Sequence, residues 1–306
     1  SICNADMRYY LGTRDAKVLA EKLPMALIHE GVGVVMRDPS GKFAPGDRVV
    51  MVPNCPTETD DYIGENYLRS SKFCGSSMDG FLQEYVEISP RRLVKLPQDI
   101  NMNVAAFTEI VSVAVHAISR FDKIAHARRD AIGVWGDGNL AYIVSLFLKK
   151  TFPDSKVYVF GLNDDKLADF TFADGAYKTT EVPEGFTMDH AFECVGGNGS
   201  PIAIEQIIGL IKPEATLSIL GVSEYPVPIN TRMILEKGLR VFGSSRSGVA
   251  DFEKTVQMYQ QYPEIIDYLG NLISSVNVVR AITDIKQACE KDTQEAIGKT
   301  IMVWQE

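Results

Sequence analysis

The chain lacks any CxxC pair, and its five cysteines are scattered through 306 residues. A disulfide framework in a secreted domain uses an even, closely spaced set of cysteines, whereas thiols in the cytosol stay reduced. The cysteine pattern therefore predicts an intracellular, cytoplasmic protein without structural disulfides. No apolar run approaches the length of about 20 residues that a transmembrane helix needs, and no signal peptide is visible. We therefore expect no membrane-spanning segment.

Basic residues are in the minority. The chain has 31 lysines and arginines against 40 aspartates and glutamates, which gives a formal net charge of −9. This balance argues against nucleic acids and anionic membranes as partners, and an anionic substrate would need a local basic cluster. The composition is that of a globular protein, and a chain of this length usually forms more than one core. Because the chain opens at Ser1, close to Cys3, we expect a few dozen residues to precede it in the full protein.

Two textures divide the sequence. Residues 1–115 alternate short apolar runs with turn residues, which indicates strands in VGVVMRD, GDRVVMVP, FLQEYVEIS and RLVKLP and an irregular lobe over 54–80. A buried helix is expected over 104–121. From 116 to 249 strands and helices alternate, which is typical of a doubly wound parallel sheet. Residues 250–306 hold a long helix and a terminal strand, and we expect them to join residues 1–115 in one domain, with residues 116–249 as the second.

A glycine-rich turn follows the strand predicted at 132–136. Gly136, Asp137, Gly138, Asn139, Leu140 and Ala141 form a GxGxxA sequence that opens a helix. The first glycine permits the tight turn, the second lets the backbone approach a pyrophosphate, and alanine still allows close packing of the helix. The free N–H groups of the helix then face the phosphates. The context of strand, turn and helix predicts a dinucleotide site, whereas the motif alone is a weak signal.

The end of the second strand bears on which dinucleotide binds. An NAD site usually places an acid there to hold the ribose 2′-hydroxyl. KVYVF ends instead at Gly161, Leu162 and Asn163, which leaves room for a 2′-phosphate and favours NADP. We also expect cofactor contacts at residues that follow the later strands, namely Cys194, Val195, Gly221, Val222 and Ser244.

Four residues that lie far apart in the sequence suggest one catalytic zinc site. Cys3, His29, Glu30 and Glu109 offer the thiolate, imidazole and carboxylate ligands that catalytic zinc uses. Cys3 could instead be a small buried apolar residue and His29 a strand-end histidine with satisfied hydrogen bonds. Glu109 lies in an apolar helix, where a carboxylate rarely occurs without a partner or a metal. The other histidines, His116, His126 and His190, are expected to be structural.

Longer runs carry a resemblance to a known family. HEGVGVV, GDRVV, DGFLQEYV, GDGNLA and FECVG resemble the medium-chain zinc alcohol and polyol dehydrogenases over the whole chain. SICNADMRYYLGTRD, GENYLRSS, LGVSEYPV and FGSSRSG are similar to one branch of that family, the ribulose-5-phosphate reductases of ribitol-phosphate (teichoic-acid-type) polymer synthesis. The resemblance implies a GroES-like catalytic domain, a Rossmann domain and a cleft between them.

The resemblance also assigns roles to single residues. It makes Cys3, His29 and Glu109 zinc ligands, with Glu30 beside the metal as an exchangeable ligand. Asp6 becomes the carboxylate that orients the ligand histidine. It also implies that Lys299, in GKTIMV, contacts the cofactor pyrophosphate.

This chain departs from the family pattern at three places. Only Cys55 and Cys74 occur where many relatives have a four-cysteine lobe, so we expect no structural zinc. Position 5 is alanine and Arg8 replaces a relay histidine, so the usual proton relay is broken. A water at the metal with Glu30 or Glu109, or Tyr9, would then handle the proton.

Arg8 also suggests recognition of a substrate phosphate, since an arginine fork matches phosphate geometry. Arg14, Arg69 and Lys72 are further candidates, but each taken singly is expected to be solvated surface charge.

The sequence therefore predicts a zinc-dependent, NADPH-dependent enzyme that reduces D-ribulose 5-phosphate to D-ribitol 5-phosphate. One alternative is an NAD(P) dehydrogenase of an unphosphorylated polyol such as sorbitol or ribitol. A second is a non-catalytic protein that only binds a dinucleotide. The resemblance further implies a homodimer and a partner cytidylyltransferase that consumes the product.

Overall fold

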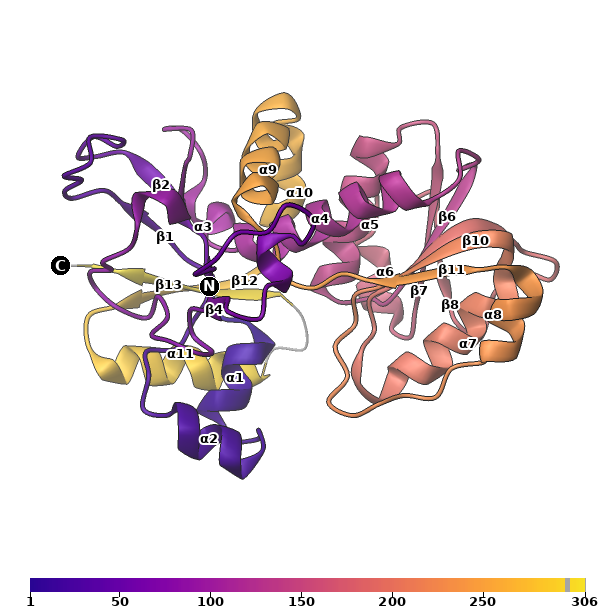
Figure 1. Cartoon of the computed structure of the whole chain (residues 1–306), viewed down its shortest axis with the longest axis horizontal. Coiled ribbons are helices and arrows are strands. Elements are labelled where there is room, and N and C mark those ends of the chain that lie inside the picture. The colour runs from indigo at the N-terminus through magenta and orange to yellow at the C-terminus, as the bar shows by residue number, and fades with distance from the viewer. Residues whose placement is uncertain (295–297, 306) are drawn as a thin grey trace. The chain divides into compact units, whose positions relative to one another are not determined.

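The chain divides into two compact units. The computed structural model describes residues 1–294 and 298–305. One unit comprises Ser1–Ser112 and Arg246–Glu306, and the other Val113–Ser245 (Figure 1). The domain limits expected from the sequence, 1–115 with 250–306 and 116–249, stay a prediction. No helix among the described residues is long and apolar enough to span a membrane.

The second unit is built on a six-stranded sheet in which every pair of neighbours is parallel, in the order β11-β10-β9-β6-β7-β8. The strands are β6 (Ala131–Trp135), β7 (Lys156–Gly161), β8 (Gly175–Lys178), β9 (Met188–Glu193), β10 (Ile211–Ile219) and β11 (Arg240–Gly243). The order reverses between β6 and β9. Ligands of doubly wound sheets bind outside the carboxyl ends of the strands at this reversal, so it positions the expected dinucleotide site.

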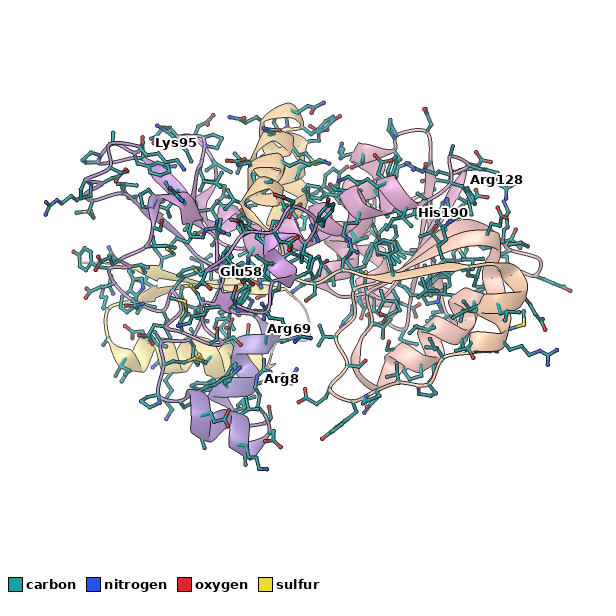
Figure 2. All side chains as sticks on the ribbon, viewed as in Figure 1. Arg8, Glu58, Arg69, Lys95, Arg128 and His190 are labelled. Atoms are coloured by element: carbon teal, nitrogen blue, oxygen red, sulfur yellow. The ribbon has the colours of Figure 1, made fainter. Side chains whose placement is uncertain are left out.

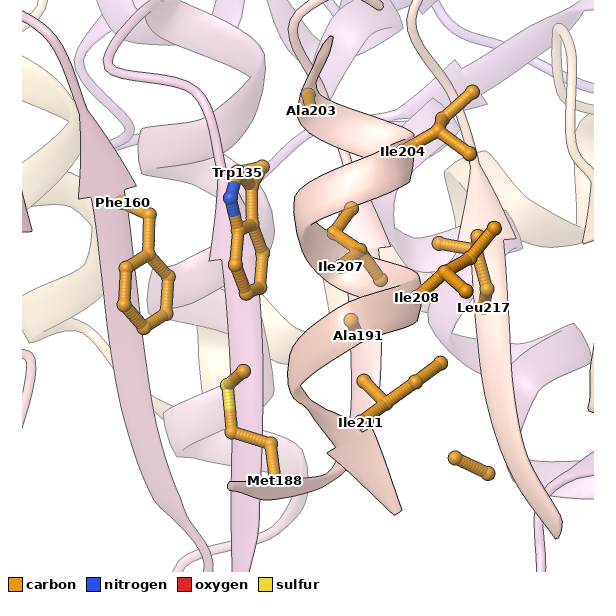
Figure 3. Packing of buried hydrophobic residues seen from close by; sticks show 11 residues of the cluster. Trp135, Phe160, Met188, Ala191, Ala203, Ile204, Ile207, Ile208, Ile211 and Leu217 are labelled. Carbon is orange, nitrogen blue, oxygen red and sulfur yellow. The ribbon is translucent and has the colours of Figure 1, made fainter. Parts of the chain in front are cut away.

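Helices flank this sheet. They are the greater part of α4 (Thr108–Ile124), α5 (Asn139–Thr151), α6 (Asp164–Ala168), η3 (Gly197–Gly199), α7 (Ser200–Leu210) and α8 (Thr231–Lys237). Figure 1 shows α5 on one face of the sheet and α7 and α8 on the other. The apolar side chains of α7 pack on the sheet beside Trp135 and Phe160, whose rings stack with their centres 4.1 Å apart (Figure 3). This buried layer packs α7 against one face of the sheet.

The first unit contains smaller sheets. β1 (Val32–Val34), β2 (Arg48–Met51) and β5 (Leu93–Lys95) are antiparallel, as are β3 (Asn54–Cys55) and β4 (Lys72–Phe73), whereas β12 (Ile273–Val279) and β13 (Lys299–Trp304) are parallel. Its helices are α1 (Asn4–Tyr10), α2 (Ala16–Lys22), η1 (Glu65–Tyr67), η2 (Pro90–Arg92), α3 (Met102–Ala105), the start of α4, α9 (Val249–Gln261), α10 (Glu264–Gly270) and α11 (Ile282–Gln294). A small core of Ile2, Met7 and Ile28 packs on Ala288 and Cys289, which fixes α1 against α11.

Three expectations about elements were wrong. FLQEYVEIS forms no strand. The N–H groups of Phe81 and Leu82 donate instead to the carbonyls of Ile28 and Leu27, where the two segments cross irregularly. The helix expected over 104–121 is two helices, interrupted at Ala106 and Phe107. The β-rich start of the chain holds α1 and α2, which the pattern of apolar residues did not indicate.

Candidate metal centre and dinucleotide site

The structure brings three of the four predicted zinc ligands into one cluster. One ligand atom each from Cys3, His29 and Glu30 lies within 4.8 Å of the other two, and no other such group of three or more occurs among residues 1–294 and 298–305. Nε2 of His29 also lies 3.8 Å from Oε2 of Glu109. Two ligands of a tetrahedral zinc, each about 2.0–2.1 Å from the metal, are separated by about 3.4 Å. Glu109 is therefore close to the spacing that a ligand of the same ion needs.

The loop that carries His29 and Glu30 is held by a strained backbone and a close crossing. Ile28 has a φ of 69°, which is rare for a β-branched residue and costs free energy. Gly80 lies against this loop, and a Cβ there would meet the carbonyl oxygen of Ile28 at 2.2 Å. Phe81 donates its N–H to the same oxygen at 2.7 Å. Glycine at position 80 therefore permits the contact that fixes the His29 backbone.

Asp6 links two of the cluster residues. Cys3 is the N-cap of α1, and its backbone N–H donates to Oδ2 of Asp6 at 3.3 Å. The other oxygen, Oδ1, is 2.9 Å from Nδ1 of His29. This is the contact that the resemblance implied for Asp6. It leaves Nε2 of His29 directed toward Glu109 and able to bind a metal.

Glu30 is paired with Lys299 in the interior. The two residues are 1% and 2% exposed. Nζ of Lys299 donates to Oε1 of Glu30 at 2.9 Å and to the carbonyl of Ile2 at 2.7 Å. It also lies 2.7 Å from Oε2 of Glu30, which accepts no hydrogen bond from the described residues. A contact between Lys299 and a pyrophosphate would therefore require Lys299 to release Glu30, and that cofactor role stays a prediction.

Glu109 and His29 carry perturbed pKa values. Burial raises the pKa of Glu109 to about 7, although the charge of His29 opposes this shift. Burial works against protonation of His29, but the nearby Asp6 and Cys3 outweigh it and hold the pKa of His29 well above its usual value. In the metal-free chain the site therefore retains protons that a bound metal would displace.

These residues fit a zinc ion. A soft thiolate, an imidazole with its other nitrogen tied to a carboxylate, and a buried carboxylate oxygen without a hydrogen bond form the donor set of a catalytic rather than a structural zinc site. The Cys55 and Cys74 thiols instead contact one another, and this hydrogen bond lowers the pKa of Cys55 to about 7 while burial opposes it.

Tyr9 and Arg8 lie further along α1. The Tyr9 hydroxyl is 3.3 Å from Oγ of Ser76 and accepts from Nζ of Lys22 at 3.3 Å. The guanidinium of Arg14 covers its ring at 4.2 Å, so Arg14 is not a freely solvated charge. Arg8 is half-buried in the last turn of α1 (Figure 2). The proton-transfer role of Tyr9 and the phosphate role of Arg8 stay predictions.

The glycine-rich turn of the second unit has an open place for a phosphate. Gly136 has a φ of 128°, and its N–H donates to the carbonyl of Phe160 at 2.8 Å. A Cβ on Gly138, the N-cap of α5, would meet nothing within 4 Å. The N-terminus of α5 therefore borders open space at Gly138, and a helix N-terminus attracts phosphates.

Asp137 shapes the end of β7. Its Oδ2 accepts the N–H groups of Leu162 and Asn163 at 2.8 and 3.0 Å. Gly161 faces it so closely that a Cβ there would meet Cβ of Asp137 at 2.7 Å. The carboxylate of Asp137 thus lies beside the end of β7, although β7 itself contains no acid. This carboxylate already accepts two backbone hydrogen bonds.

Glu193, which the sequence analysis missed, organises the later turns. It is fully buried and accepts the N–H groups of Val195, Gly196 and Gly221 at 2.8–3.2 Å. Gly196 approaches Val222 closely, and a Cβ on it would meet that residue's backbone at 2.8 Å. Glu193 therefore holds together the turns that contain Cys194, Val195, Gly221 and Val222. Ser244 follows β11 and donates its N–H to the carbonyl of Ile219 at 3.0 Å.

His190 lies on β9 in the second unit. It is fully buried, and its two ring nitrogens contact the carbonyl of Arg128 at 3.0 Å and the N–H of Thr216 at 3.1 Å, which agrees with a structural role (Figure 2).

Arg246 was not singled out by the sequence analysis. Its Cζ lies 4.8 Å from the ring centre of Phe73, and the ring of Phe73 lies 5.5 Å from that of His29.

Known proteins resemble both units. Residues 1–98 match the alcohol dehydrogenase GroES-like domain, which confirms that expectation. The chain is 56% identical over 305 residues to the ribulose-5-phosphate reductase of Bacillus spizizenii, across 100% of this chain and 89% of that protein. It is 31% identical over 226 residues to the sorbitol dehydrogenase of Rattus norvegicus, across 72% of this chain and 58% of that protein.

A solved structure is similar over the whole length. The crystal structure of S. aureus TarJ in complex with NADPH gives a TM-score of 0.89 at 47% identity and covers 100% of this chain and 89% of that one. The similarity to the reductases therefore includes the GroES-like part, the parallel sheet and the segment after it, whereas the similarity to the sorbitol dehydrogenase is weaker and shorter.

Proposed function

Because this chain belongs to the medium-chain alcohol and polyol dehydrogenase family, in the branch of the ribulose-5-phosphate reductases, we propose that it reduces D-ribulose 5-phosphate with NADPH. The carbonyl at C2 becomes a secondary alcohol, and the product is D-ribitol 5-phosphate. The observation that carries the proposal is the cluster of Cys3, His29 and Glu30, with His29 oriented by Asp6.

Zinc is proposed as the resident metal. Cys3 and His29 hold it, together with Glu109 or Glu30. When bound, zinc acts as a Lewis acid that polarises the ketone of the substrate. Asp6 keeps His29 in the tautomer that presents Nε2, since its carboxylate accepts the proton on Nδ1. Lys299 draws Glu30 toward itself and so leaves room at the metal for a substrate oxygen.

NADPH is proposed to bind the turn at Gly136 and Gly138 and the segments organised by Asp137 and Glu193. When bound, it supplies the hydride that reduces C2. The α5 N-terminus attracts the pyrophosphate. Because neither Leu162 nor Asn163 is an acid, the end of β7 tolerates a 2′-phosphate. The relative TarJ, whose structure contains NADPH, supports this choice.

The developing alkoxide needs a proton. Glu109 would deliver one when Glu30 rather than Glu109 holds the zinc, because a carboxylate bound to the metal carries no proton to give. Glu30 and Tyr9 are the alternatives. Glu30 is held by Lys299, and the Tyr9 hydroxyl is held by Ser76 and Lys22.

The substrate phosphate needs a cation, and the sequence suggested Arg8 for this role. A polyol dehydrogenase acting on an unphosphorylated substrate is less well supported, because the sorbitol dehydrogenase is similar over only 58% of its own length. A non-catalytic role would not require the cluster of metal-binding side chains.

We further propose a cytoplasmic homodimer whose product serves cell-surface polymer synthesis and is consumed by a cytidylyltransferase. Light scattering of the purified protein tests the dimer.

The experiment for the function follows NADPH oxidation at 340 nm with ribulose 5-phosphate, ribulose and xylulose 5-phosphate. We expect ribulose 5-phosphate and NADPH to be preferred, one zinc per chain, and no turnover by Cys3→Ser at unchanged secondary structure. Equal or better efficiency with NADH, or full activity of Cys3→Ser without metal, contradicts the proposal.

A further inference from the structure

The metal cluster poses a charge problem for a phosphorylated substrate. Its neighbourhood is acidic, with Asp6, Glu30 and Glu109 all buried. Lys299 lies there but is committed to Glu30 and to the carbonyl of Ile2. A phosphate near these carboxylates therefore needs a cation of its own.

Arg246 has the properties of such a cation. It is half-buried, and no hydrogen bond or ion pair engages its guanidinium within residues 1–294 and 298–305. Its only described side-chain partner is the face of the Phe73 ring, with Cζ 4.8 Å from the ring centre. Stacking of this kind leaves the N–H donors at the edge of the guanidinium available for an anion. Burial lowers the pKa of Arg246, with the charge of Glu109 opposing the shift, but arginine remains charged at neutral pH.

Arg246 lies within reach of the phosphate of a substrate whose ketone is at the metal cluster. Phe73 contacts both Arg246 and His29, and the two distances place Cζ of Arg246 at most about 10 Å from the centre of the His29 ring. Five single bonds of about 1.5 Å separate C2 of ribulose 5-phosphate from phosphorus, which spans roughly 6 Å in extended form. Coordination at one end and a hydrogen bond of about 2.8 Å at the other account for the remaining distance.

The backbone conformation at Arg246 is strained and is fixed by contacts of its loop. Its φ of 59° lies in the left-handed region, an unfavourable conformation for arginine that the surroundings must enforce. The hydroxyl of the next residue, Ser247, is 2.6 Å from that of Ser112. The N–H of Val249 donates to Oε1 of Glu65 at 2.8 Å. These contacts fix the loop directly after the strained position, so the side chain is oriented before a ligand arrives.

Other nearby arginines are already used. Arg92 forms a two-pronged ion pair with Glu65 at 2.9 and 3.0 Å. Arg14 donates to the carbonyl of Ala5 and stacks on Tyr9. Arg246 differs from both in offering a charged fork that no described carboxylate occupies.

We propose that Arg246 anchors the phosphate of the substrate and thereby selects phosphorylated ketoses over free ones. The proposal rests on the proposed function, because it names how that site recognises ribulose 5-phosphate. It assigns to Arg246 the role that the sequence suggested for Arg8.

Kinetics on a matched substrate pair test the assignment. Arg246→Ala keeps a residue with a Cβ at the strained position, so it changes the side chain without relieving the backbone. Arg246→Lys keeps the charge but loses the planar fork. Arg8→Ala tests the rival residue, and Arg37→Ala, an exposed arginine, is the control for the same change of net charge.

We expect Arg246→Ala to lower kcat/KM for ribulose 5-phosphate about 10- to 150-fold, the range of a charge-assisted hydrogen bond pair. The loss with unphosphorylated ribulose should be less than about twofold, within the range of surface changes. Arg246→Lys should be intermediate and Arg37→Ala unchanged. Inorganic phosphate should compete with ribulose 5-phosphate in the wild type and compete more weakly in Arg246→Ala.

Calorimetry provides a readout that does not depend on turnover. Binding of ribitol 5-phosphate should weaken in Arg246→Ala, whereas binding of NADPH should not. Equal losses on both substrates, weakened NADPH binding, or a phosphate-selective loss in Arg8→Ala alone overturns the Arg246 assignment. A wild-type protein that oxidises no NADPH with ribulose 5-phosphate refutes the proposed function itself, which separates the two failures.

Discussion

Replacing Lys299 with methionine removes the cation that neutralises Glu30 while keeping much of the side-chain volume. Both residues are almost fully buried, and Nζ lies 2.9 and 2.7 Å from the two carboxylate oxygens. Removing one partner of a buried ion pair leaves an uncompensated charge and costs about 3–5 kcal/mol. For a cooperative unit of this size, about 2–4 °C of Tm is lost per kcal/mol, so we expect Tm to fall by about 6–20 °C.

The assay is thermal and urea unfolding of the metal-free protein. Glu30→Gln serves as the reciprocal single variant, and Lys299→Met combined with Glu30→Gln removes both charges. The double variant should recover most of the lost stability, because its interior no longer holds an unpaired charge. Zinc should stabilise Lys299→Met more than the wild type, since the released Glu30 gains a new cation.

A loss below about 1 kcal/mol in Lys299→Met would refute this reasoning, since that is the range of an exposed ion pair. A double variant that is simply the sum of the two single ones would show that the two charges do not interact.

Three further predictions concern the metal and cofactor sites. In the metal-free chain, stability should fall as pH rises from about 4.5 through 7, because burial raises the pKa of Glu109 to about 7 and the folded state then binds the extra proton. The loss is about 3 kcal/mol at most, and urea unfolding at pH 5 and 8 should show it in the wild type. In Glu109→Gln the loss should be much smaller. The remainder comes from His29, because its raised pKa changes stability with the same sign. Asp6→Asn should weaken zinc binding about 10- to 100-fold in a chelator competition, since His29 loses its carboxylate partner, and unchanged affinity would contradict that role. Asn163→Asp should lower the preference for NADPH over NADH about 10-fold or more, because a carboxylate repels the 2′-phosphate. The new carboxylate can still cap α6, so the fold should be unaffected. An unchanged ratio of kcat/KM values would place the 2′-phosphate elsewhere.

The Rossmann half was predictable because its elements are long and their patterns agree. The runs that became β6 and β7 are buried parallel strands rich in apolar residues, and the glycine turn marks the start of α5. β8 (Gly175–Lys178) was missed because it is a short edge strand with mixed polarity. The helix α1 was missed because Cys3 and Asp6, which cap it, were interpreted through their metal chemistry alone.

The metal cluster was predictable because its residue types are chemically unusual for their surroundings. Cys3, His29 and Glu30 do lie together. The pairing of Glu30 with Lys299 spans 269 residues of sequence, and no local pattern indicates it. Arg246 was missed for a similar reason, since its position beside Phe73 depends on a left-handed backbone and on tertiary contacts that an arginine in FGSSRSG does not reveal.

The central claim is hydride transfer from NADPH to C2 of ribulose 5-phosphate, and isotope transfer tests it most directly. The zinc-loaded protein is mixed with ribulose 5-phosphate and NADPH that carries deuterium at the transferable position of the nicotinamide, and the product is examined by NMR. The account predicts ribitol 5-phosphate with one deuterium at C2, and no labelled product with Cys3→Ser. Deuterium at another carbon, a product without label, or the same labelling by Cys3→Ser would contradict it.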